Sequence, residues 1–197
     1  MKKFFLIFVL LCMQSMASEQ NAKPAAATIY DLRAKFHNTN NKPSSIAVAK
    51  GSYTLMAMVY TSCPHACPMT IHKIKSIDSE FQKAGVQDLK IVLVSFDVKK
   101  DTPKNLKKYQ AASKLEPEKW ILLSSDSEAD ARELAVTLGI SFKDLGDGDF
   151  SHSNVITLLD SEGVVLESIN NLNAPVDKLV AALKLDKEKA KTTPTVK

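Results

Sequence analysis

Two cysteines stand close together in a short segment of the chain that is rich in proline. Cys63 and Cys67 lie within residues 61–68 (TSCPHACP). Three residues separate the thiols, one more than in a Cys-x-x-Cys redox motif, so a disulfide is allowed but the dithiol geometry is looser. Thiolates attack disulfides and also bind soft metals. The pair therefore predicts a redox or metal site, with a purely structural disulfide as the alternative.

A metal held by two thiolates needs a further ligand in many sites, and the chain offers four histidines. His72 follows Cys67 by five residues, about 140° around a helix, which predicts a surface position. His37 lies in a polar stretch and is also expected at the surface. His65 lies between the cysteines and His152 precedes a predicted buried strand, so each is either a ligand or an exposed or capping residue. Two sulfurs and one imidazole suit copper in either oxidation state, with zinc as a competitor.

The segments that flank the cysteines indicate which elements hold them. Residues 53–60 (YTLMAMVY) form an almost continuous apolar run typical of a buried strand, whereas residues 68–84 change to a helical spacing of apolar residues. Pro68 suits the first helical position, so Cys67 is expected at or near the N-cap. Unpaired N–H groups at a helix start favour thiolates, so both sulfurs are expected to be reactive.

The rest of the chain continues the alternation of strands and helices. Further strands are predicted at residues 90–96, 120–123, 154–159 and 164–169, the last two joined by a turn. Further helices are predicted after Pro103, after a capping box formed by Ser125 and Glu128, and after Pro175. This order predicts an α/β, thioredoxin-like, three-layer fold, in which helices flank a central mixed sheet that closes with a β-hairpin.

The first seventeen residues have the pattern of a secretory signal peptide. Lys2 and Lys3 precede an apolar run at residues 4–13, which is too short to span a membrane, and small residues precede a predicted cleavage site after Ala17. The alternatives are an uncleaved anchor and, disfavoured by the large residues before it, lipidation at Cys12. The protein is therefore expected to be exported to a periplasm, either soluble or anchored to the inner membrane by this segment.

Composition and charge describe one neutral domain with polar ends. The predicted organisation is a signal peptide at 1–17, a flexible leader at 18–27, one domain at 28–185 and a disordered tail at 186–197. The formal net charge of +4 comes from lysines in the signal and the tail, so the domain itself is neutral. A nucleic-acid partner is not supported, and membrane contact is expected only if the N-terminal segment is retained.

Four parts of the sequence resemble the Sco/SenC family of copper-binding, thioredoxin-like proteins that serve cytochrome c oxidase assembly. They are residues 59–68 (VYTSCPHACP), residues 94–109 (VSFDVKKDTPKNLKKY), Trp120 and residues 150–163 (FSHSNVITLLDSEG). The likeness spans roughly residues 30–183, and the combination of Cys-Pro-x-x-Cys-Pro, Asp-Thr-Pro and a late histidine is specific. By matching position, the resemblance implies that Cys63, Cys67 and His152 are copper ligands, with Cys63 and Cys67 also the redox pair.

The resemblance implies a periplasmic copper metallochaperone. Its partner would be the copper-bearing subunit of cytochrome c oxidase or another copper chaperone. The alternative is a thiol–disulfide oxidoreductase that acts on cysteines of a copper-binding target through the same two thiols. A peroxidase is disfavoured, because the sequence has no independent peroxidatic cysteine motif.

Several residues depart from the family pattern or carry weaker signals. His65 stands where the family commonly has an acidic residue, and Asp97 matches the family but is followed by Val98 in place of proline. His65 and Asp97 are therefore predicted to lie beside the copper ligands. A further departure is that the glycine-rich segment usual in the family before the strand at residues 53–60 is reduced to Gly51.

Other polar and sulfur-containing residues have plainer interpretations. Met56 and Met58 suit core packing, and Met69 is a weak ligand candidate. Asp101 is predicted to cap the next helix. The lysines at 99–108 predict a solvated helix face or a docking surface for an acidic partner.

Overall fold

The computed structural model describes residues 28–146 and 148–192, so the predicted signal peptide and leader lie outside the described residues. Within this part, seven strands form one sheet in the order β2-β1-β5-β4-β3-β8-β9, and two further strands pair as β6-β7. The strands are β1 (Phe36–Asn38), β2 (Pro43–Ser44), β3 (Tyr53–Val59), β4 (Leu89–Ser95), β5 (Trp120–Ser125), β6 (Phe142–Gly146), β7 (Asp149–His152), β8 (Ile156–Leu159) and β9 (Val165–Ile169).

The centre of the sheet is parallel and its two margins are antiparallel. Strands β3, β4 and β5 run parallel, and β3 also pairs with β8, which forms an antiparallel hairpin with β9. Parallel neighbours need crossover connections, which are supplied by α2 (Ala66–Lys83) and α3 (Pro103–Ala112). The predicted thioredoxin-like fold with a mixed sheet and a closing hairpin is confirmed.

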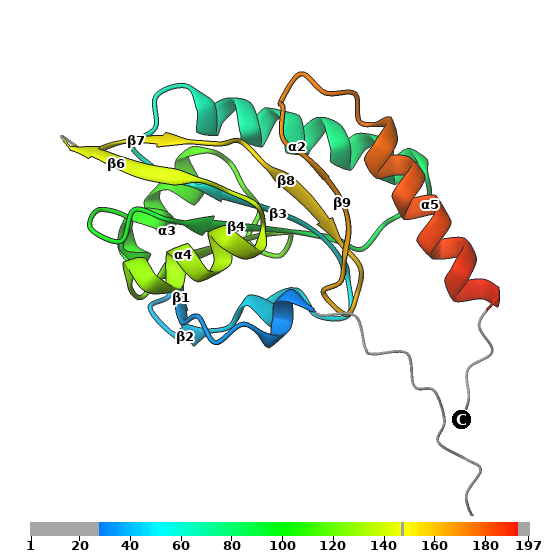
Figure 1. Cartoon of the computed structure of the whole chain (residues 1–197), viewed down its shortest axis with the longest axis horizontal. Coiled ribbons are helices and arrows are strands. Elements are labelled where there is room, and N and C mark those ends of the chain that lie inside the picture. The colour runs from blue at the N-terminus through cyan, green and yellow to red at the C-terminus, as the bar shows by residue number, and fades with distance from the viewer. Residues whose placement is uncertain (1–27, 147, 193–197) are drawn as a thin grey trace, which may run out of the picture.

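Helices cover both sides of this sheet. In Figure 1, α2 and α5 (Asp177–Thr192) lie on one side and α4 (Glu128–Thr137) lies on the other. The central strands are buried on both faces, as their apolar runs predict, and Met56 and Met58 are core residues. The short 3₁₀ turn η1 (Ile29–Asp31) precedes β1, and a second one, η2 (Ile46–Ala49), joins β2 to β3.

The start of α2 differs from the prediction. The helix begins at Ala66 with His65 as its N-cap, so Cys67 is the second helical residue and Pro68 the third. Proline is accommodated there because the first N–H groups of a helix have no intrahelical partner. The N–H of Cys67 is instead donated to the sulfur of Cys63, at 3.3 Å.

Two predicted capping residues are wrong, because each lies one or two residues before the N-cap that the structure shows. Ser125 belongs to β5 and its hydroxyl donates to the Ser95 carbonyl, whereas Ser127 caps α4 by accepting from the N–H of Asp130. Likewise Thr102, rather than Asp101, caps α3. Asp101 is buried and serves the cysteine loop instead.

Two hairpins and about two turns of a helix were absent from the prediction. The strands β1, β2, β6 and β7 are short and carry many exposed residues, so they lack the apolar runs of the core strands. Helix α5 continues to Thr192, so residues 186–192, predicted as part of a disordered tail, are helical; residues 193–197 lie outside the described part. Lysine, glutamate and alanine are good helix formers, which explains the extension.

Candidate metal centre

The cysteine loop connects the end of β3 to the start of α2. A turn is closed by the N–H of Cys63, which donates to the Tyr60 carbonyl at 3.2 Å. Both thiols are free and buried, with exposed fractions of 9% for Cys63 and 1% for Cys67. The sulfur of Cys67 accepts from the N–H of Tyr60 at 3.4 Å. The backbone thus aims N–H groups at both sulfurs and holds them on the same side of the loop.

His152 reaches this loop from the last position of β7. Its ring lies 5.7 Å from the ring of Tyr60 and 5.3 Å from that of Phe96, measured between centroids. Its Nδ1 lies 3.2 Å from the carbonyl oxygen of Ser153. A carbonyl only accepts, so this bond requires the proton on Nδ1 and leaves the lone pair of Nε2 available to a metal.

Cys63, Cys67 and His152 converge on one point. One donor atom from each lies within 4.8 Å of the other two. Three ligands in a plane around an ion, each at about 2.0–2.3 Å, would lie about 3.5–4 Å apart, so the donor atoms would have to approach one another by about 1 Å at most. The side chains present therefore fit a soft, three-coordinate metal ion, and the structure brings together the three residues that the sequence singled out as candidate ligands.

The two thiols differ in acidity, contrary to the expectation that both are activated. Burial alone raises the pKa of Cys63, but the N–H donors of Cys67 and His65 oppose it, and the pKa is lowered. Burial dominates at Cys67 and raises its pKa, against the opposing N–H of Tyr60. The donors at the start of α2 therefore stabilise the thiolate of Cys63, the more exposed of the two.

Asp101 accepts hydrogen bonds from the cysteine loop, a role that the sequence did not reveal. Its carboxylate accepts from the N–H of Thr61 at 2.9 Å, from the Thr61 hydroxyl and from the Ser95 hydroxyl at 2.6 Å. Burial raises the pKa of Asp101, and the hydrogen bonds from Ser95 and Thr61 oppose that shift. Asp101 therefore fixes the residue two positions before Cys63.

A second unpredicted contact joins the loop to the hairpin that carries His152. The hydroxyl of Tyr60 donates to the carboxylate of Asp149 at 2.6 Å. The Tyr60 ring also packs at 5.1 Å from Phe150 and 5.3 Å from Phe96. No local motif identifies this contact, because its two polar residues are 89 positions apart.

His65 and Asp97 lie near the site in different ways. His65 is exposed at the N-cap of α2, and its backbone N–H is one of the donors to Cys63. Asp97 is buried, and one of its oxygens accepts from the N–H groups of Lys99 and Lys100 at 3.2 and 3.0 Å. Among the described residues, its other oxygen has no hydrogen-bond partner. Asp97 thus holds the turn that leads to Asp101.

The remaining histidines are outside the cluster. His37 pairs with Asp126, the nitrogen and oxygen lying 2.6 Å apart, and His72 is exposed on α2. Neither belongs to the cluster of donors around the cysteines.

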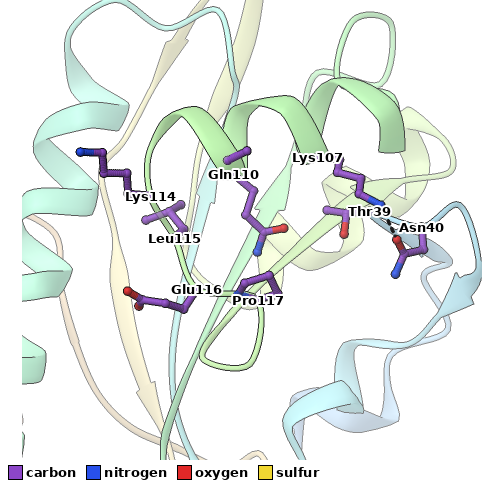
Figure 2. Close-up of a pocket in the computed structure, with 9 residues that line it drawn as sticks. Thr39, Asn40, Lys107, Gln110, Lys114, Leu115, Glu116 and Pro117 are labelled. Atoms are coloured by element: carbon purple, nitrogen blue, oxygen red, sulfur yellow. Dashed lines mark hydrogen bonds between the residues drawn. The ribbon is translucent and has the colours of Figure 1, made fainter.

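A separate groove of about 560 Å³ lies beside α3, away from the cysteines. Figure 2 shows that it is bordered by Lys107, whose ammonium group donates to Asn40 at 2.9 Å, and by Leu115 and Pro117 at the far end of the helix. Its lining is mostly apolar and includes none of the three clustered residues.

The family model described as SCO1/SenC matches residues 23–185. This chain belongs to the SCO1/SenC family. A curated relative, the SCO1 protein homolog of Bacillus subtilis (strain 168), is 28% identical over 186 residues, which cover 91% of this chain and 92% of the relative.

Solved structures share the fold of this SCO1/SenC protein. Arabidopsis thaliana ScoI with copper bound has a TM-score of 0.67 and 23% identity, covering 79% of this chain and 96% of its own. BsSco, a member of the Sco family of cytochrome c oxidase assembly proteins in which a disulfide switch was identified, has a TM-score of 0.66 and 24% identity, covering 83% and 97%.

The described helices were compared with the length and hydropathy of membrane-spanning helices. Over residues 28–146 and 148–192, no helix combines the length and the apolar character needed to cross a bilayer.

Proposed function

We propose that this SCO1/SenC protein is a periplasmic copper metallochaperone. It binds copper through Cys63, Cys67 and His152 and delivers it to the copper-bearing subunit of cytochrome c oxidase, directly or through another copper chaperone. The observation that carries the proposal is the convergence of two thiols and one imidazole within 4.8 Å. Family membership and the copper-bound relative from Arabidopsis thaliana support it.

The donor set favours copper as cargo over harder ions. Two sulfurs and one imidazole form a soft set of low coordination number, for which zinc is the main competitor. Burial of both thiols keeps water from the site, and the bond from His152 to the Ser153 carbonyl orients the imidazole before the metal arrives.

Release to a partner requires an entry point for the partner's ligands. Cys67 is closed off, with 1% of its surface exposed, whereas Cys63 is 9% exposed and His152 is half-buried. An incoming thiolate or imidazole therefore displaces His152 or Cys63 first, and Cys67 is the last ligand to leave.

Copper loading depends on the oxidation state of the cysteines. Metal ligation uses thiolates, and a disulfide between Cys63 and Cys67 removes both. The binding experiment therefore starts from reduced protein and measures copper stoichiometry and the copper–thiolate absorption spectrum. We expect about one tightly bound copper that His152→Ala weakens, while His37→Ala, remote from the cluster, leaves it intact. An unchanged affinity and spectrum in His152→Ala would rule out the three-ligand site.

Export rests on the pattern of residues 1–17. The proposal predicts that the mature protein begins after Ala17 and fractionates with soluble periplasmic proteins; retention of the segment would place it on the inner membrane. Mass measurement of the N-terminal peptide from fractionated cells distinguishes the two outcomes.

Supporting roles are proposed for His65 and Asp97. His65 would supply its backbone N–H to Cys63 and leave its imidazole at the mouth of the site. Asp97 would act through the backbone turn that precedes Asp101. Both roles predict weaker copper binding in Asp97→Ala and near-normal binding in His65→Asn.

The unequal acidity of the thiols favours a second candidate, a thiol–disulfide oxidoreductase acting on cysteines of a copper-binding target. The Cys63 thiolate would attack a target disulfide, and Cys67, after losing its proton, would release the reduced target and leave a Cys63–Cys67 disulfide, a transfer of two electrons. This activity needs no metal and no His152. Reduction of a disulfide substrate by metal-free His152→Ala protein at the wild-type rate would favour it over the chaperone.

A further inference from the structure

The outer face of α2 carries three soft or borderline metal donors that the cysteine site does not use. His65, Met69 and His72 follow one another at intervals of four and three residues, which places them along one face of the helix. His65 and His72 are exposed, and Met69 is 54% exposed. Their side chains therefore form a continuous stripe on the surface, here called the α2 stripe.

Packing does not account for the α2 stripe. Within the part of the chain that the structure describes, no side-chain hydrogen bond, ion pair or ring contact involves His65, Met69 or His72. Met56 and Met58, by contrast, are buried in β3 and fill the core. At 54% exposure, Met69 gains only part of the hydrophobic stabilisation of a buried methionine, and its sulfur is accessible to a metal ion.

Met69 and His72 also face the same hollow. A depression of about 310 Å³ lies between this part of α2 and the loop at Leu172 and Asn173, and both side chains line it. The loop is fixed to the helix by Lys73, whose ammonium group donates to the Ala174 carbonyl at 2.6 Å. Neighbours three residues apart on a helix have Cβ atoms about 5–6 Å apart, close enough for a sulfur and an imidazole to share one ion.

The α2 stripe begins at the cysteine loop. His65 caps the helix and its N–H is directed at the sulfur of Cys63. Met69 is one turn further along, and His72 one turn beyond that, so the stripe extends about 10 Å from the loop. Met69 follows the N-cap residue His65 by four residues and precedes His72 by three, so it is one turn from either imidazole.

We propose that the α2 stripe is a second, weaker copper(I) site, held by Met69 and His72 and able to shift toward the cysteines by exchanging His72 for His65. Thioethers are soft ligands that select copper(I), and copper(I) accepts few ligands. Each exchange replaces one neutral donor by another, so no electron or proton is transferred. Only the direction of movement, toward Cys63, rests on the proposed chaperone function; binding by the stripe does not.

Copper(I) titration of the reduced full chain carrying Cys12→Ser, which removes the thiol of the predicted signal peptide, tests the stripe in competition with a coloured copper(I) chelator. We expect about two copper(I) ions per chain for the wild type and about one for Met69→Leu, which keeps the size of the side chain but removes its sulfur. Met69→His replaces the lost donor and is expected to restore the second ion. Ser76→Ala is the matched control, because Ser76 lines the same hollow without a soft donor, and it should leave both ions.

A variant that lacks the cysteine site separates this inference from the proposed function. In Cys63→Ala/Cys67→Ala protein that also carries Cys12→Ser, about one weakly bound copper(I) should remain, and Met69→Leu should abolish it. The ε-methyl NMR signal of Met69 should shift as this ion binds. A wild-type stoichiometry of about one that Met69→Leu leaves unchanged would overturn the α2 stripe and leave the cysteine site standing. Full retention of tight copper in the cysteine-free protein would overturn the cysteine site instead.

Discussion

Tyr60 and Asp149 connect the cysteine loop to the strand that carries His152. The phenol of Tyr60, at the start of the loop, donates to the carboxylate of Asp149 at the first position of β7, at 2.6 Å. This is a direct polar link between the two parts of the candidate metal centre. The distance between His152 and the two sulfurs therefore depends on one hydrogen bond as well as on aromatic packing.

Removing the hydroxyl in Tyr60→Phe should weaken copper binding by about tenfold to a hundredfold, the range seen when groups that orient metal ligands are lost. The ring is retained, so the aromatic contacts with Phe96 and Phe150 persist. Tyr53→Phe is the matched control, because its hydroxyl donates at 2.9 Å to Asp186 in α5 and not to the hairpin that carries His152. Competition titration of the two variants gives the comparison, and equal affinities would show that the Tyr60 bond does not position His152.

Alkylation of the reduced, metal-free protein should modify Cys63 well before Cys67. The pKa of Cys63 is lowered and that of Cys67 is raised, and the thiolate is the reactive form. The reaction of Cys63 should therefore reach half its maximal rate at a lower pH than the same cysteine in urea-unfolded protein. Peptide mass mapping after timed treatment with iodoacetamide, across a pH series, locates each modification. Faster labelling of Cys67 would contradict the assigned asymmetry.

The buried Asp101 should make stability depend on pH. Its pKa is raised in the folded state, chiefly by burial, so the folded protein binds a proton at a pH where the unfolded chain does not. Acidification through the range between the two pKa values therefore raises the free energy of unfolding through this group, and the gain is lost as pH rises through the folded-state pKa. Asp101→Asn removes the gain. Urea unfolding of both proteins from neutral to mildly acidic pH should show the wild type improving relative to the variant; a shift the other way would show a lowered pKa.

The C-terminal helix should contribute to stability through its buried face. Leu183 has no exposed surface, so Leu183→Ala should lower the free energy of unfolding by about 2–5 kcal/mol. Leu185, two residues further along, is 57% exposed, and Leu185→Ala should change the free energy of unfolding by less than about 0.5 kcal/mol. Denaturant unfolding of the two variants compares a buried and an exposed leucine of the same helix, α5. Similar losses at both positions would contradict the packing of α5.

The sequence predicted those features that rest on long apolar patterns. Strands β3 and β4 are continuous apolar runs, and α2 has a buried face of residues such as Ile74 and Phe81, so their type and order followed from periodicity alone. Capping residues were harder to predict, because a shift of two residues moves the cap from Ser125 to Ser127 without changing the composition of the segment.

The site was predicted only in part, for a physical reason. Cys63 and Cys67 are neighbours in the sequence, so their proximity is local. His152 joins them through β6 and β7, whose alternation of half-buried and exposed residues is a weak signal, and through Tyr60–Asp149, a contact across 89 positions. Spacing therefore left His152 open between ligand and surface residue, and family resemblance was needed to assign it.

Strands β6 and β7 form a two-stranded sheet of their own, with a register irregularity between Asp144 and Gly146. In that register, Phe142 is opposite His152. Side chains alternate between the faces of a strand, so a slip of one residue would turn the imidazole away from the cysteines while the seven-stranded sheet stayed intact. The register of this two-stranded ribbon therefore determines whether the third donor faces the sulfurs, and a substitution at the irregularity is expected to change copper affinity without altering any ligand.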